Sequence, residues 1–207
     1  GLWRTLADIR RHRQAALFLL AYFFYIDGVD TIIAMATAYG RDLGFGVGLL
    51  IAVLLVIQIV AFPCALAFGR LARRFSAKRM ILAGIAVYAV VVAVAFLLPG
   101  IASIELKTLL FWVIAVLVAS AMGGIQALSR SLFCRLIPPG RNAEYFGFYN
   151  VFGKFAAITG PFLMGLITHQ SGDSRWGVLS ILALLLIGAW LLALVRAEED
   201  GDADGRA

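Results

Sequence analysis

The chain has 207 residues, of which 62% are hydrophobic and only 14% are charged, and its formal net charge is +6. Soluble globular domains average roughly 45–50% apolar and about 25% charged residues. The composition therefore excludes an ordinary water-soluble domain, and also a disordered chain and a disulfide-stapled secreted module. The excess of apolar side chains indicates contact with lipid.

The first 14 residues form a basic segment that is separate from the apolar chain after it. Leu2, Trp3, Leu6 and Ile9 recur at helical spacing, with arginines between them. This pattern predicts an amphipathic linker helix that lies on the membrane surface. The alternative is a solvated basic leader.

Six apolar segments follow, each about as long as a membrane-spanning helix, which needs about 20 mostly apolar residues. The apolar runs are continuous and do not alternate, which excludes a β-barrel. We therefore predict an all-α polytopic membrane protein with a six-helix transmembrane bundle over 15–196. An acidic tail over 197–207, predicted to be disordered, ends the chain. The predicted spans are Ala15–Ala38, Val47–Phe68, Met80–Leu98, Thr108–Leu132, Tyr145–Thr168 and Val178–Val195.

The basic residues between the spans predict the orientation in the membrane. Fourteen of the 18 lysines and arginines lie before the first span, around every second connection or in the tail, and only three lie around the opposite connections. The positive-inside rule then places both termini in the cytoplasm. The positive net charge reflects this orientation, and it predicts no nucleic-acid partner, because no basic recognition element accompanies it.

Two carboxylates and one ammonium group lie near the middle of predicted spans, where a charge costs about 2.5–3.5 kcal/mol on insertion scales. Asp27 and Asp30 share one helical face with Thr31. Lys154 lies in the fifth span, four residues after Asn150. Such residues need a partner or a wet cavity, so they mark a candidate substrate or ion pathway.

We expect Lys154 to pair with Asp27 or Asp30, which leaves the second carboxylate available for a proton or a cationic substrate group. Gln126 in the fourth span would add polar lining together with Asn150, or both amides would hold helices together. The alternative for the charged residues is an ion pair that fixes helix packing and transports nothing.

Enzyme chemistry is not indicated by any motif. No nucleophile–base pair, phosphate-binding glycine loop or Cys/His metal spacing can be recognised. The sequence thus predicts no catalytic residue, no metal site and no cofactor.

The loop at 69–79 resembles the cytoplasmic signature of the major facilitator superfamily, Gly-x-x-x-Asp-Arg-x-Gly-x-Lys-Arg. Gly69, Arg74, Lys78 and Arg79 match it, while Arg73 and Ser76 replace its Asp and its second Gly. The stretches 25–32, 123–133 and 146–155 extend the likeness to the carboxyl-terminal half of the vacuolar-effluxer-like branch, whose fungal members export amino acids.

The resemblance implies a secondary transporter that moves small solutes, amino acids among them, by alternating access, with proton coupling as an option. It further implies two three-helix repeats of inverted topology and a partner in the missing amino-terminal six-helix half. We expect the protein to lie in the plasma (inner) membrane of a bacterium. The alternatives are a non-transporting scaffold or receptor, an integral membrane lipid enzyme, or a complete six-helix protein that works with a second copy of itself.

Overall fold

The computed structural model describes residues 12–138 and 140–196. The predicted interfacial linker helix lies almost entirely outside the described residues, and the predicted acidic tail lies entirely outside them. What the structure describes is the predicted transmembrane bundle.

Six long helices make up the bundle, and all six are long and apolar enough to cross a membrane. Four predicted spans lie inside one helix each, and the spans Met80–Leu98 and Val178–Val195 pass the end of α4 and α7 by one residue. The prediction of an all-α membrane bundle is confirmed, and the described residues contain no strand. The helices extend beyond most predicted spans because charged residues outside the apolar core still continue a helix. They are α2 (Arg13–Asp42), α3 (Val47–Phe75), α4 (Ala77–Leu97), α5 (Ile104–Leu136), α6 (Asn142–Ser171) and α7 (Ser174–Leu194), with a short 3-10 turn, η1 (Leu98–Gly100).

Short connections with recognisable end signals separate the helices. Gly172 ends α6 in the left-handed conformation with φ of 69° and donates its N–H to the carbonyl of Thr168. Asp173 then accepts a hydrogen bond from the backbone N–H of Arg175 and begins α7. Ser103 caps the start of α5 in the same way. Such tight turns keep consecutive helices antiparallel.

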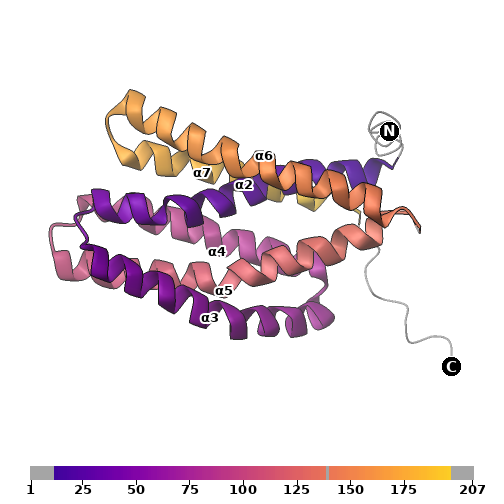
Figure 1. The fold of residues 1–207 in the computed structure, drawn as a ribbon, viewed down its shortest axis with the longest axis horizontal. Helices are drawn as coiled ribbons and strands as arrows, with labels where there is room; N and C mark the ends of the chain where they lie inside the picture. The colour runs from indigo at the N-terminus through magenta and orange to yellow at the C-terminus, as the bar shows by residue number, and fades with distance from the viewer. Residues whose placement is uncertain (1–11, 139, 197–207) are drawn as a thin grey trace.

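The packing of the helices repeats after three elements. α3 packs against α5 and α6 packs against α2, while α4 packs against α5 and α7 packs against α2. Exchanging α2–α4 with α5–α7 therefore converts each of these contacts into its equivalent. Because α2 and α5 are separated by two further helices, they run in opposite directions (Figure 1). This is the arrangement of two three-helix repeats with inverted topology.

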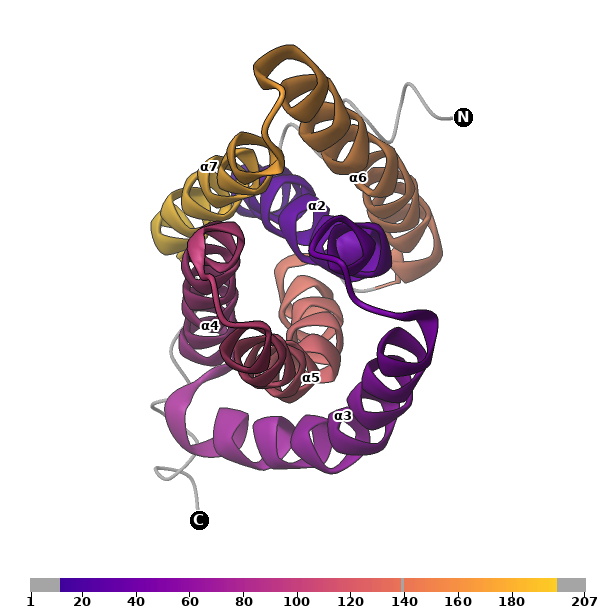
Figure 2. The ribbon, with the colours of Figure 1, turned by 90° about the vertical axis from the view of Figure 1, so that its left-hand side faces the viewer.

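Burial is uneven among the six helices. Only 11% and 17% of the most apolar stretches of α3 and α6 are buried, against 44–56% for the other four helices. Seen from one end, α3 forms an outer edge of the bundle beyond α5, and α6 forms another beyond α2 (Figure 2). The larger part of the surface of α3 and α6 therefore faces lipid or another protein.

Candidate functional site

Asp27 lies in the middle of α2 and is fully buried against α6. Its Oδ1 accepts a hydrogen bond of 2.6 Å from the backbone N–H of Gly160. Its second oxygen, Oδ2, has no hydrogen-bond partner, and the equally buried Oγ1 of Thr31 also lacks one. One oxygen of the buried carboxyl group is therefore paired with a neutral backbone donor, and the other is left without a partner.

The close approach of α6 to Asp27 depends on a glycine. A Cβ atom at Gly160 would overlap both the Oδ1 of Asp27 and the Oγ1 of Thr31. Pro161 follows, and since proline has no N–H, the carbonyl of Ala157 loses its usual helical donor. This turn of α6 therefore offers α2 one backbone donor and leaves one backbone acceptor without its helical bond.

The other predicted pathway residues are more accessible than Asp27 and Thr31. Asp30 is half-buried, and Gln126, Asn150 and Lys154 are exposed. The six predicted site residues thus separate into a buried pair between α2 and α6 and an accessible group on α2, α5 and α6.

The expected ion pair between Lys154 and Asp27 or Asp30 is wrong. Among the described residues, the ion pairs within 4.0 Å join Arg141 to Glu144 and Arg175 to Asp173. The reason is the register of α6. Lys154 precedes Gly160 by six residues, which at 3.6 residues per turn places it about 120° around the helix and roughly 9 Å along it. The backbone of Gly160 takes the place beside Asp27 that the ammonium group was expected to hold.

An aromatic and hydroxyl cluster beside the buried carboxylate was missed by the sequence analysis. The hydroxyls of Tyr25 and Ser129 join α2 to α5 at 2.6 Å, and Ser129 is fully buried. The ring of Tyr22 stacks on that of Tyr149 at 4.1 Å between centroids. The aromatic run at 22–25 is the signal in the sequence that could have indicated this cluster.

A mainly apolar groove of about 350 Å³ lies between α2, α3 and α5. Its wall includes Ile33, Val53, Phe111 and Met122, and one amide, Gln58 of α3, contributes a polar group. Gln58 was not among the predicted pathway residues. The groove gives the bundle a concave, accessible region next to the two central helices.

The predicted loop motif is divided between two helices. Gly69 and Arg74 belong to α3, whereas Lys78 and Arg79 belong to the first turn of α4. Between the helices, Ser76 adopts φ of 71° and ψ of 149°, and its side chain accepts a hydrogen bond from the N–H of Arg79 at 3.4 Å. The motif therefore forms the tight turn that joins α3 to α4.

Lys78 connects this turn to the end of α7 through two hydrogen bonds. Its Nζ donates to the carbonyl of Ala193 at 2.8 Å and to that of Val195 at 2.7 Å. These are carbonyls at a helix C-terminus, where cations are favoured. The structure thus assigns Lys78 a contact between helices that are more than 100 residues apart in the chain.

Known proteins resemble this chain along nearly its whole length. Residues 1–204 match the family described as "Vacuole effluxer Atg22 like". A relative from Bacillus subtilis, named "Uncharacterized MFS-type transporter YxiO", is 47% identical over 97% of this chain and 45% of its own length. "Autophagy-related protein 22-1" of Aspergillus niger is 29% identical over 96% of this chain and 34% of its own length. The chain therefore spans less than half the length of these relatives, and it belongs to the vacuole effluxer Atg22-like family.

Proposed function

We propose that this chain is the carboxyl-terminal half of a secondary transporter that moves small solutes by alternating access. The inverted three-helix repeats support this, since many transporters are built from such repeats and carry their binding sites near the membrane midplane. The transporter name of the bacterial relative supports it as well. The amino-terminal six-helix half, or a second copy of this bundle, would cover the poorly buried faces of α3 and α6.

The buried carboxyl of Asp27 is the observation that carries the proposal. Burying an ionised carboxylate is costly in hydrocarbon, and Gly160 supplies only one neutral hydrogen bond to offset it. Protonation at Oδ2 removes the charge. Opening of the α2–α6 contact would expose the carboxyl to water, where it would release the proton. Asp27, with Thr31 beside it, would then couple proton movement to the change in conformation.

The accessible predicted residues would line the solute pathway. Asp30 and Lys154 present opposite charges, and Gln126 and Asn150 present amides. An amino acid carries one ammonium and one carboxylate group, so this set suits amino acids or similar small zwitterions. We propose that both termini lie in the cytoplasm, because the basic residues concentrate on the side of the membrane where Arg13 and Arg196 lie. We further propose a bacterial plasma membrane, since a bacterial relative is 47% identical to this chain.

The proposal is tested with full-length protein in liposomes, by measuring uptake of labelled amino acids with and without a pH gradient. Asp27→Asn keeps an oxygen that accepts from Gly160 but cannot release a proton at physiological pH. We expect this variant to lose gradient-driven uptake and to retain exchange of substrate across the membrane at zero gradient. Unchanged gradient-driven uptake would contradict proton coupling at Asp27.

A second variant separates substrate contact from coupling. Lys154→Met removes an exposed ammonium group without touching the α2–α6 contact. We expect a higher KM for the transported solute and an unchanged dependence on the pH gradient. If both variants transport like the unmodified protein, neither residue takes part in transport. Absence of uptake by the unmodified protein would favour the non-transporting scaffold instead.

A further inference from the structure

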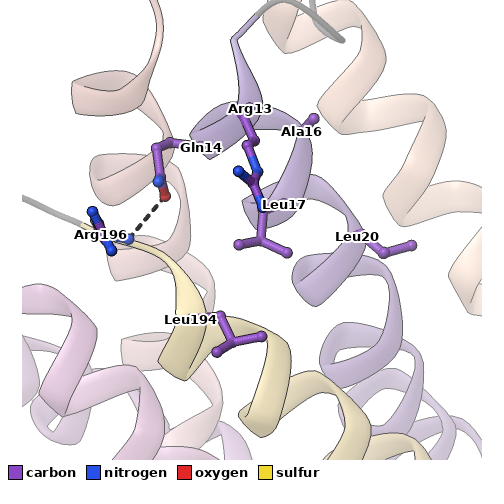
Figure 3. A pocket seen from close by; sticks show the side chains of 7 residues that line it. All are labelled: Arg13, Gln14, Ala16, Leu17, Leu20, Leu194 and Arg196. Carbon is purple, nitrogen blue, oxygen red and sulfur yellow. Dashed lines mark hydrogen bonds between the residues drawn. The ribbon is translucent and has the colours of Figure 1, made fainter.

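A pocket of about 590 Å³ lies where the first turns of α2 meet the end of α7, at one end of the bundle (Figure 3). Polar side chains form one part of its wall, namely Arg13, Gln14 and Arg196. Apolar side chains form the other part, with Leu17 and Leu20 from α2 and Leu194 from α7. The pocket is therefore amphipathic, and its two kinds of surface lie side by side along the helix axes.

The segment that carries Arg196 is held in place. The backbone N–H of Arg196 donates to the Oε1 of Gln14 at 2.8 Å (Figure 3). Lys78 bonds the carbonyls of Ala193 and Val195, on either side of Leu194. Three hydrogen bonds thus fix the chain as it leaves α7, so the wall of the pocket is preorganised.

The polar part of the pocket favours an anion. Neither Arg13 nor Arg196 forms an ion pair within 4.0 Å with any of the described residues. The first turn of α2 contains no acidic residue, and its N-cap residue, His12, makes no side-chain capping bond. The helix dipole at this N-terminus adds to the positive potential of the two guanidinium groups.

The apolar part of the pocket is open to lipid. Leu20 is 44% exposed and Leu194 is 49% exposed. Leu17, Leu20 and Leu194 lie on the side of the arginines that leads into the apolar length of α2 and α7 (Figure 3). An inorganic anion would leave these side chains uncovered, whereas an acyl chain would cover them.

We propose that this pocket binds one anionic phospholipid from the surrounding leaflet. Its phosphate would lie between Arg13 and Arg196, and an acyl chain would lie along Leu17, Leu20 and Leu194. Basic pockets between membrane helices on the cytoplasmic side are suited to such head groups. The bound lipid would contact both the start of α2 and the end of α7, which are the first and the last helix of the bundle.

Lipid binding is measured directly on full-length protein that has been purified in detergent and stripped of lipid. Native mass spectrometry counts bound phosphatidylglycerol and phosphatidylcholine with matched acyl chains. We expect phosphatidylglycerol to bind about tenfold more tightly, because two arginines face its phosphate and no cation of its own offsets that charge. The double variant Arg13→Gln/Arg196→Gln should lose this preference.

The control variant Arg70→Gln/Arg74→Gln removes two exposed arginines from α3, outside the pocket. It should keep the preference to within about twofold, since only diffuse surface charge is lost. In a second measurement, phosphatidylglycerol with brominated acyl chains should quench the fluorescence of a Leu20→Trp variant more than brominated phosphatidylcholine does. Equal losses in the two double variants would overturn the proposal, and so would displacement of phosphatidylglycerol by millimolar inorganic phosphate.

Discussion

Gly160 sets the distance between α2 and α6 at the buried carboxylate. Its N–H reaches Asp27 only because no side chain stands between the two helices. Gly165, one and a half turns further along the same helix, has no atom within 4 Å of the place where its Cβ would lie. The two glycines therefore have different roles, although both belong to α6 and lie only five residues apart.

Substitution by alanine separates these roles. We expect Gly160→Ala to lower the free energy of unfolding by about 1–3 kcal/mol, because the new methyl group forces Asp27 and Thr31 apart. Gly165→Ala should be neutral or stabilising by up to about 1 kcal/mol, as expected for an exposed helical position. Thermal unfolding in detergent compares the two. Equal effects would mean that the approach at Gly160 does not limit packing.

Ser76 stands where the backbone favours glycine. With φ of 71° and ψ of 149°, it occupies a region that other residues rarely adopt, at a cost of about 1–3 kcal/mol. Its capping bond is long, at 3.4 Å, and so compensates little. We expect Ser76→Gly to raise the unfolding temperature and Ser76→Ala to leave it unchanged or lower it. A decrease for Ser76→Gly would show that the cap outweighs the strain.

Candidate site residues can be recognised in the sequence where a charged residue lies in an apolar run. Asp27, Asp30 and Lys154 stand out in this way, but the partner of a charge depends on how two helices rotate against each other. The donor to Asp27 is a backbone N–H, which composition cannot reveal. The pairing of Tyr25 with Ser129 was likewise beyond reach, since tyrosine and serine are common in helices.

At the scale of helices, the turn from α3 to α4 holds the end of α7 through Lys78. The spans themselves were predictable, because hydropathy over about 20 residues decides them. The residues at which the helices begin and end were harder to predict than the spans. α3 continues to Phe75, seven residues past its predicted apolar span, because arginines are good helix formers outside the hydrocarbon.

Loss of the Lys78 contact should loosen α7 locally. We expect Lys78→Met to lower the free energy of unfolding by about 1–2 kcal/mol, since two charge-assisted bonds to helix carbonyls are removed at a half-buried site. Hydrogen exchange should rise at residues 190–196 and stay unchanged in α5. Arg70→Met, which removes an exposed basic residue of α3 away from this contact, serves as the control. A uniform rise in exchange would contradict a local role.

At the scale of the whole molecule, burial indicates which faces need a cover. Ile59 of α3, Ile158 of α6 and Trp190 of α7 have similar exposed fractions, of 71%, 67% and 64%. However, α3 and α6 are the least buried helices, whereas α7 packs against both α2 and α4. The exposed faces of α3 and α6 are therefore the ones that we expect another protein to cover.

Spin labels can distinguish the covered faces from the lipid-facing ones in the full-length protein. We expect labels at Ile59 and Ile158 to collide less with dissolved oxygen than a label at Trp190, because the other half of the transporter would shield the first two. The measurement is power-saturation electron paramagnetic resonance in liposomes. Equal oxygen accessibility at the three positions would argue against a partner on α3 and α6.

The internal symmetry of the bundle relates two contacts whose chemistry differs. Where α5 meets α3, Gly124 lies against Phe68 and Gly123 against Ala65, so the glycine contacts there are with apolar side chains. Where α6 meets α2, the equivalent joint contains the carboxyl of Asp27. If Asp27 exchanges a proton as proposed, a change in pH would loosen the contact between α6 and α2 and leave the contact between α5 and α3 unchanged. The two repeats, alike in shape, would therefore respond unequally to the same stimulus, and any bending of the bundle would begin on one side.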